Sequence, residues 1–228
     1  MLRGNKAEQV IIDDFEFQSD VDTVLILTHK EHNVTLLPHL EWLKKTNPAV
    51  RVEVIVGEDH PEGKVRNWKN GDVPLREWWK KNSHSVDGEV IAVVEWDTLV
   101  SCKLPALPAG YDLVGKRLYM EDINMKGVWQ WYSEIPLLEL QDGETACGLV
   151  SFGFFIMRRQ VLDSVCLPRW DSIYDKSIQN ELRFPTIASV EGAKVGEIPL
   201  PNVGYHEVKF TGNRDIYHGV KNVQDFEF

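Results

Sequence analysis

Blocks of apolar and polar residues along the first hundred positions predict three buried strands separated by two helices. Each predicted strand is a run of apolar, largely β-branched residues that ends in polar ones, and leucines at helical spacing mark the first helix. Pro38 falls early in that helix, where the first turn tolerates a proline, and Asn47-Pro48 ends it. This order predicts a parallel sheet with helices on its faces. The strands are predicted at residues 21–30, 50–59 and 89–97, and the helices at 33–48 and 74–84.

The second half of the chain has a less regular pattern. Residues 105–122 are punctuated by Pro and Gly and predict a loop with one short strand. A strand followed by a helix from about Arg159 is predicted over 148–165, and a helix followed by a strand near Val195 over 177–199. No internal repeat or linker is visible. We therefore expect a lead-in or tail at 1–20 and a single domain over 21–228, with halves at 21–100 and 101–228.

Polar residues follow each of the three predicted strands, and the third strand ends in Glu95-Trp96-Asp97. In open α/β sheets the ligand crevice lies outside the carboxyl ends of the strands. Glu95 and Asp97 stand two residues apart, so both point the same way on a strand. There they can approach one hard cation such as Mg²⁺ or Mn²⁺, which takes oxygen ligands. The alternative is two solvated acids at a strand end.

Composition narrows the possible partners. The 228 residues include 25 Lys and Arg against 35 Asp and Glu, a formal net charge of −10, which argues against a nucleic-acid surface. A nucleotide ligand would then need a local cation. The sequence shows no apolar run of membrane-spanning length and no signal peptide, and its three cysteines lack metal-type spacing, so we expect a cytoplasmic protein. The eight tryptophans serve packing or form the aromatic walls of a cleft.

The order of several segments resembles the nucleotide-sugar-dependent glycosyltransferases of the GT-A fold. "VVEWDTLV" resembles the metal-binding acid-x-acid signature of that family, with Glu95 in place of the commoner Asp. The resemblance covers roughly residues 21–221 and implies a mixed, mostly parallel central sheet flanked by helices. Its other segments are "LILTHK" and "VGED" at the first two strand ends, "GLVSFGFFIMRRQVLDSV" on the acceptor side, "NELRFPTIASVEGAKVG" with an acid on a helix, and "IYHGVK" near the C-terminus.

The resemblance implies transfer of a sugar from a nucleoside-diphosphate sugar, with UDP favoured, to a hydroxyl of a glycan or small acceptor. Residues 21–100 are then the nucleotide-binding half and 101–228 the acceptor-binding half. A hard cation, Mn²⁺ or Mg²⁺, would be held by Glu95 and Asp97. The residues expected to contact the nucleotide sugar are Thr28, His29, Lys30, Glu58, Asp59, Glu95, Trp96 and Lys221.

Two histidines compete to be the third metal ligand. His218 is favoured because it precedes Gly219, with Lys221 three residues on; His206 has much the same surroundings. A neutral imidazole can complete the cation's shell, and a lysine supplies a point charge to the phosphates. Cation and lysine together would stabilise negative charge on the departing diphosphate.

An inverting transfer also needs a base for the proton of the acceptor hydroxyl, and a carboxylate is the usual choice. Glu181 is the favoured candidate from its place in "NELRFPT", with Asp175 and Asp171 as alternatives. The competing interpretation pairs Glu181 with Arg183 or a neighbouring lysine on an exposed helix. A retaining reaction would need no such base.

Two other functions stay open. A nucleotidyltransferase that makes nucleotide sugars would normally carry a Gly-rich basic loop after the first strand, where this sequence has "THKEHN". A non-catalytic carbohydrate- or nucleotide-binding module would suit the tryptophans, but it has no need of the acid pair and the histidine.

Overall fold

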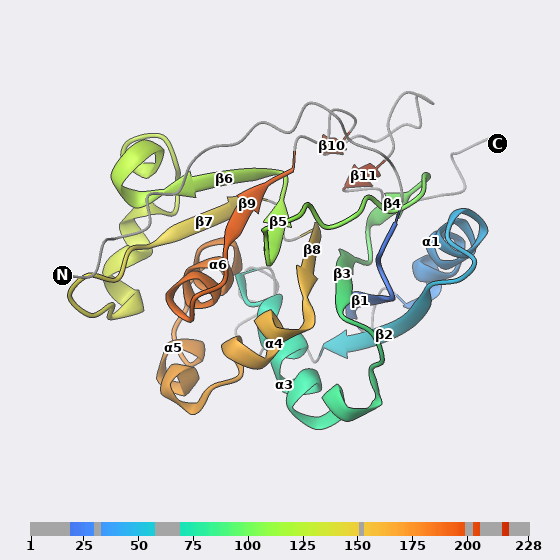
Figure 1. Ribbon diagram of the computed structural model, residues 1–228, viewed down its shortest axis with the longest axis horizontal. Helices are drawn as coiled ribbons and strands as arrows, with labels where there is room; N and C mark the ends of the chain where they lie inside the picture. The colour runs from blue at the N-terminus through green and yellow to red at the C-terminus, as the bar shows by residue number, and fades with distance from the viewer. Residues whose placement is uncertain are drawn as a thin grey trace.

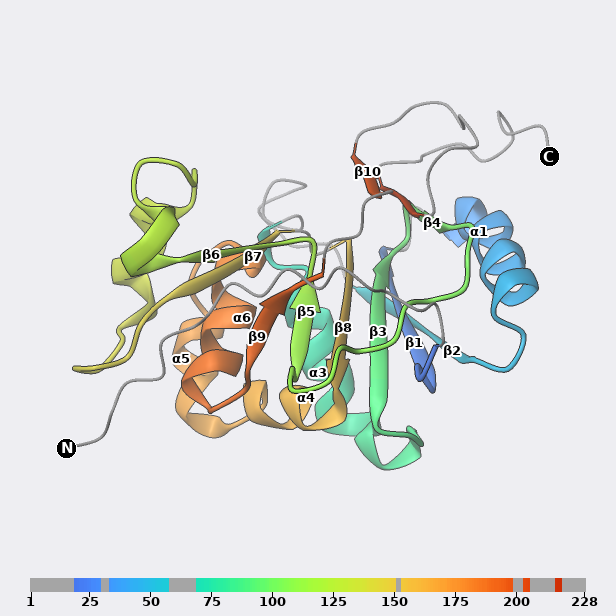
Figure 2. The ribbon, with the colours of Figure 1, turned by 45° about the horizontal axis from the view of Figure 1, so that its top comes forward.

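A six-stranded sheet forms the centre of the molecule, in the order β2-β1-β3-β8-β5-β9 (Figures 1 and 2). The computed structural model describes residues 19–29, 33–57, 69–150, 153–198, 203–205 and 216–218. The strands are β1 Thr23–His29, β2 Arg51–Gly57, β3 Val90–Glu95, β4 Thr98–Val100, β5 Leu113–Gly115, β6 Arg117–Met120, β7 Cys147–Val150, β8 Phe154–Arg158, β9 Val195–Glu197, β10 Val203–Tyr205 and β11 Ile216–His218. The helices are α1 Asn33–Thr46, α3 Asp72–Asn82, α4 Arg159–Val165, α5 Asp171–Tyr174 and α6 Asn180–Val190, with shorter helical turns η2 Ser83–Ser85, η3 Glu121–Met125, η4 Tyr132–Leu138 and η5 Pro168–Trp170.

The central sheet is mixed but mostly parallel, as predicted. β1 pairs in parallel with both β2 and β3, and β5 pairs in parallel with β9. β8 lies between β3 and β5 and is antiparallel to both. All strands of this sheet except β8 therefore run in one direction, and their carboxyl ends share one edge.

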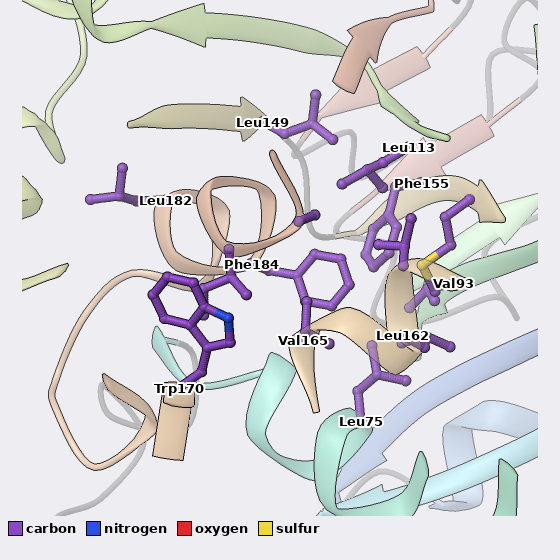
Figure 3. Packing of buried hydrophobic residues seen from close by; sticks show 14 of the residues in the cluster. Leu75, Val93, Leu113, Leu149, Phe155, Leu162, Val165, Trp170, Leu182 and Phe184 are labelled. Carbon is purple, nitrogen blue, oxygen red and sulfur yellow. The ribbon is translucent and has the colours of Figure 1, made fainter. Parts of the chain in front are cut away.

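Helices cover both faces of the sheet, which explains why its central strands are apolar without interruption. Leu25 and Val93 point into a core shared with α3, α4 and α6, where Phe184 packs against Phe155 with ring centroids 5.4 Å apart (Figure 3). Their neighbours along the strands, such as Val24, point to the opposite face, where the core includes leucines of α1. The alternation buries successive residues of one strand in two different cores.

Two smaller sheets flank the central one. Antiparallel β6 and β7 carry an arm, residues 117–150, that extends from one end of the central sheet with η3 and η4 between its strands (Figure 2). β4 continues the chain just beyond β3 and pairs antiparallel with β11, which in turn pairs in parallel with β10. This second small sheet lies beyond the carboxyl ends of β1 and β3 (Figure 1).

The five elements predicted for the first hundred residues are confirmed, with α3 beginning at Asp72 rather than residue 74. Three details were wrong. Pro38 is the sixth residue of α1, beyond its first turn. Residues 105–122 contain two short strands, and 148–165 contain parts of two strands before the helix, which does begin at Arg159. The expected lead-in at 1–20 lies almost wholly outside the described residues, so the division into a tail and one domain stays a prediction.

No helix within the described ranges is both long enough and apolar enough to cross a membrane.

Candidate active site

The ends of β1 and β3 lie side by side, as the polar strand ends predicted. Leu27 is the partner of Glu95 across the two strands, and the backbone N–H of Trp96 donates to the carbonyl of Leu27 at 2.8 Å. On its other side, the N–H of Glu95 donates to the carbonyl of Gly153 at 3.0 Å, just before β8. His29 pairs with Gly57 at the end of β2. The first three strands therefore finish at one edge, with the acid pair at the end of β3, a central strand of the sheet.

Alternation along β3 assigns Glu95 to one face of the sheet. Val94 and Trp96 pack in the core on the α1 side, whereas Val93 packs in the core beneath α3, α4 and α6. Glu95, next to Val94 in the strand, belongs to the same face as Val93. Asp97 lies in the turn between β3 and β4, and both acids are half-buried. Both carboxylates thus stand at the carboxyl edge, at the border between sheet and solvent.

The N-termini of two helices reach the same edge. α3 precedes β3 and α6 precedes β9 through short connections, so each helix runs opposite to its strand and begins where the strands end. Glu181 lies in the first turn of α6 and is half-buried, between the buried polar residues Gln179 and Asn180 and the rest of the helix. Asn180 Oδ1 accepts the N–H of Glu181 at 2.8 Å, which pairs one of the N–H groups that have no partner within the helix in its first turn.

The pairing of β4 and β11 brings the favoured third metal ligand to the acid pair. Thr98, the residue after Asp97, is the backbone partner of His218, and His218 is also the partner of Tyr205 in β10. Paired Cα atoms in an antiparallel ladder are about 4.5–5.5 Å apart. The backbone of His218 is therefore within a few ångströms of the β3–β4 turn, and the chain reaches His206 directly after Tyr205.

The described side chains include two of the three predicted ligands. His206 and Lys221 lie outside the described residues, as does the side chain of His218. Among the side chains that are described, no three His, Cys, Asp or Glu residues are grouped closely enough to hold a metal ion. The metal roles of Glu95, Asp97 and His218 remain predictions.

The nucleotide-contact residues predicted at the strand ends have different surroundings. Thr28 is buried, and its hydroxyl donates to the carbonyl of His29 at 3.3 Å. A Cβ atom on Gly57 would lie 3.0 Å from Pro74 Cγ and 3.4 Å from His29 Nδ1, so the glycine lets the His29 ring lie close to the start of α3. Lys30, Glu58 and Asp59 lie outside the described residues.

The three candidate bases differ in exposure and partners. Asp171 is exposed and bound by Arg76 and by Lys80, and its hydrogen bonds to these two cations lower the pKa of its carboxyl. A lowered pKa makes a carboxylate a weaker base. Asp175 is exposed and directly follows α5, whereas Glu181 is the second residue of α6, at the edge where the strands finish. Its role as the base stays a prediction.

The alternative in which Glu181 pairs with Arg183 is wrong, because Arg183 pairs with Asp72. Burial lowers the pKa of this guanidinium, but the charge and hydrogen bonds of Asp72 raise it by more than burial lowers it. The net shift is upward, and Arg183 is charged. Sequence reasoning missed Asp72 altogether, along with the polar residues Gln179 and Asn180. The signal for the last two was a run of polar residues directly before the helix.

No protein-family model matches the sequence, and no curated protein matches it. Among solved structures, the galactosyltransferase LgtC in complex with donor and acceptor sugar analogues is 11% identical over 87% of this chain and 86% of LgtC, with a TM-score of 0.48. A protein from STIV is 15% identical over 78% and 83%, with a TM-score of 0.42. The bifunctional glycosyltransferase WbbM is 12% identical over 96% of this chain, with a TM-score of 0.50.

The likeness to WbbM concerns the fold alone, and this chain spans 49% of the WbbM chain. It extends over nearly all of the sequence and includes the mostly parallel sheet with helices on both faces. The chain therefore has the GT-A fold of glycosyltransferases, which the order of its sequence segments predicted.

Proposed function

We propose that this chain is a metal-dependent glycosyltransferase. It takes a sugar from a nucleoside-diphosphate sugar, with UDP as the favoured nucleotide, and transfers it to a hydroxyl of a glycan or small acceptor. One observation carries the proposal: on a GT-A fold, Glu95 and Asp97 lie at the end of the central strand β3, at the edge where α3 and α6 begin. A strand buried on both faces has no structural need for two acids at its end.

The donor is proposed to lie across the ends of β1 and β2. His29 and the backbone near Gly57 form the described part of this surface. The hydroxyl of the buried Thr28 donates to the carbonyl of His29. Trp96 anchors the acid pair by packing into the core on the α1 side. Lys30, Glu58, Asp59 and Lys221 are proposed to complete the donor contacts.

The residues at this edge fit a hard divalent cation. Glu95 and Asp97 supply oxygen donors, and His218, whose backbone pairs with Thr98, is proposed as the nitrogen donor. Two carboxylates with one imidazole suit Mn²⁺, and Mg²⁺ is the alternative. When bound, the cation supplies positive charge to the diphosphate.

Glu181 is proposed to receive the proton of the acceptor hydroxyl in an inverting transfer. The acceptor oxygen forms a bond to the anomeric carbon while the bond from that carbon to the diphosphate breaks. The nucleoside diphosphate leaves with the electron pair, and Lys221 is proposed to stabilise its charge. Glu181 is half-buried in the first turn of α6, at the edge where the strands finish.

Thermal unfolding with UDP, GDP or CDP, each with Mn²⁺ or EDTA, tests the donor site. A ligand at a hundred times its Kd stabilises the native state by about 2.7 kcal/mol, which is about 5–10 °C in Tm for a chain of this size. We expect a shift with UDP that requires Mn²⁺. Asp97→Ala should abolish it, and Asp122→Ala, an exposed acid on the arm, should keep it.

Two results would overturn the proposed donor site. The first is the absence of a Mn²⁺-dependent shift with any of the three nucleotides. The second is a shift that survives unchanged in Asp97→Ala, because the acid pair would then have no part in binding. Release of UDP from UDP-glucose, UDP-galactose and UDP-N-acetylglucosamine then measures turnover, and a protein that binds UDP but releases none from any donor is a binding module rather than a transferase.

A further inference from the structure

Asp72 and Arg183 form a fully buried ion pair that joins the first turn of α3 to α6. The guanidinium donates to both carboxylate oxygens, with Nε 2.8 Å from Oδ2 and Nη2 bonded to Oδ1. Nη2 also donates to Asn70 Oδ1 at 3.2 Å, and Nη1 donates to the carbonyl of Lys176 at 3.1 Å. The arginine is therefore fixed in position and in orientation by groups on two separate segments of the chain.

Stability alone is a weak reason for such a pair. Removing two charges from water is costly, and well-packed apolar residues of similar volume are often at least as stabilising. The helix around the pair is largely apolar, since Leu182 and Phe184 on either side of Arg183 are buried in the core beneath the sheet. What a bidentate pair supplies beyond apolar packing is a defined geometry.

The geometry that the pair defines is the rotation of α6 about its own axis. Residues two apart on a helix are separated by about 200° around the axis, so Glu181 and Arg183 point to opposite sides. The exposures agree, because Arg183 is buried and Glu181 is half-exposed. A second contact holds the same turn, in which the N–H of Gln179 donates to Glu134 Oε2 at 2.6 Å. Fixing Arg183 therefore fixes the direction of Glu181.

We propose that Asp72 and Arg183 are positioning residues for Glu181: the buried pair sets the direction in which the first turn of α6 presents this carboxylate to the acceptor hydroxyl. The inference rests on the proposed function, in which Glu181 is the base. The hydrogen bonds of the pair go to Asn70 and Lys176 and not to Glu95 or His29 at the donor end of the site.

Arg76 offers a matched comparison within the same core. It is also a buried arginine, its Nε donates to the carbonyl of Val165 at 2.8 Å, and it pairs with Asp171. The guanidiniums of Arg76 and Arg183 lie over the same ring, 4.3 and 4.6 Å from the centroid of Tyr174. Val165 belongs to α4, and Asp171 and Tyr174 belong to α5, so none of these partners lies on α6 and the removal of Arg76 should disturb the core without turning that helix.

The experiment compares the double variant Asp72→Leu/Arg183→Met with Arg183→Lys and with the control Arg76→Met. For each, we would measure Tm, the affinity for UDP with Mn²⁺, and kcat and KM for UDP release from the UDP-sugar that the wild-type protein turns over fastest. The double variant should lose about 10- to 100-fold in kcat, the effect of a misplaced catalytic group, with KM and UDP affinity unchanged. Arg76→Met should keep its kcat. Arg183→Lys keeps the charge but not the planar fork, and should show an intermediate kcat.

The possible results separate the inference from the function on which it rests. A folded double variant with wild-type kcat overturns the inference, as does an Arg76→Met variant that loses as much kcat as the double variant. Should the double variant not fold, Arg183→Lys decides, and a wild-type kcat there overturns the inference. A wild-type protein that releases no UDP overturns the proposed function and this inference together.

Discussion

Gly148 of β7 lies directly against the indole of Trp129, which makes Gly148→Ala a sharp test of how the arm packs. A Cβ atom at this position would be 2.1 Å from Cη2 and 2.2 Å from Cζ3 of Trp129. These distances are far inside van der Waals contact, so the ring must move. Trp129 is buried and stacked on Tyr119, with ring centroids 5.3 Å apart and planes 9° from parallel. The movement therefore breaks the stack as well.

The expected cost follows from these two effects. Overpacking a core typically costs about 1–3 kcal/mol, and losing a stacked aromatic pair costs about 0.5–1.5 kcal/mol. We therefore expect Gly148→Ala to lower the free energy of unfolding by about 2–4 kcal/mol, which corresponds to about 5–15 °C in Tm for a chain of this size.

Urea unfolding of the variant measures this cost, with Gly143→Ala as the control. Gly143 has φ +89°, and a Cβ atom added there would have no heavy atom within 4 Å, so alanine meets backbone strain without a clash. Such strain costs about 1–2 kcal/mol. Adding Trp129→Leu to Gly148→Ala should recover part of the loss by making room. Equal costs for the two alanine variants would refute the steric reasoning.

Three further predictions follow from buried or paired groups. The hydroxyl of Thr186 donates to the carbonyl of Cys147 at 2.7 Å and accepts its N–H at 3.0 Å, so Thr186→Val should cost about 2–4 kcal/mol in urea unfolding by leaving two buried backbone groups unpaired. Burial raises the pKa of the Cys147 thiol to about 12, so a thiol reagent at pH 8 should label it only after unfolding; labelling in the native protein at the unfolded rate would contradict this. Hydrogen bonds from Arg76 and Lys80 lower the pKa of Asp171 in the folded state, so its stabilising effect is present above the unfolded pKa of about 4 and is lost as the pH falls through the lowered folded value. Asp171→Asn should therefore flatten the fall in Tm on acidification, and an unchanged Tm–pH curve would show that the pair contributes nothing.

The central strands could be predicted because burial on both faces requires an apolar residue at every position. Val24 and Leu25 are neighbours in β1 that pack into opposite cores, so neither position can be polar. The same argument places Glu95 and Asp97 at the edge from sequence alone, since an unpaired carboxylate is costly inside such a strand. Local sequence thus determines where the acid pair lies along the strand.

The position of β8 could not be predicted in this way. Residues 148–165 predicted a single strand before the helix, whereas β7 belongs to the arm and β8 is inserted beside β3. The pairing of Val94 with Phe154 joins residues 60 positions apart and has no local pattern, because a strand buried on both faces looks alike whichever way it runs. The antiparallel insertion is a property of the whole sheet.

The wrong pairing predicted for Arg183 shows that the spacing of two residues on a helix predicts their contact better than their opposite charges do. Opposite charges two residues apart suggested a pair with Glu181, yet residues at that spacing face opposite sides of a helix. Arg183 stands instead between Leu182 and Phe184 on a helix that is buried over most of its length, and a buried guanidinium requires a buried acid. That acid is Asp72, 111 residues away in the sequence, and only the tertiary fold could identify it. An arginine in the apolar part of a predicted helix therefore indicates a distant carboxylate, and here that carboxylate joins the starts of the two helices that meet the candidate active site.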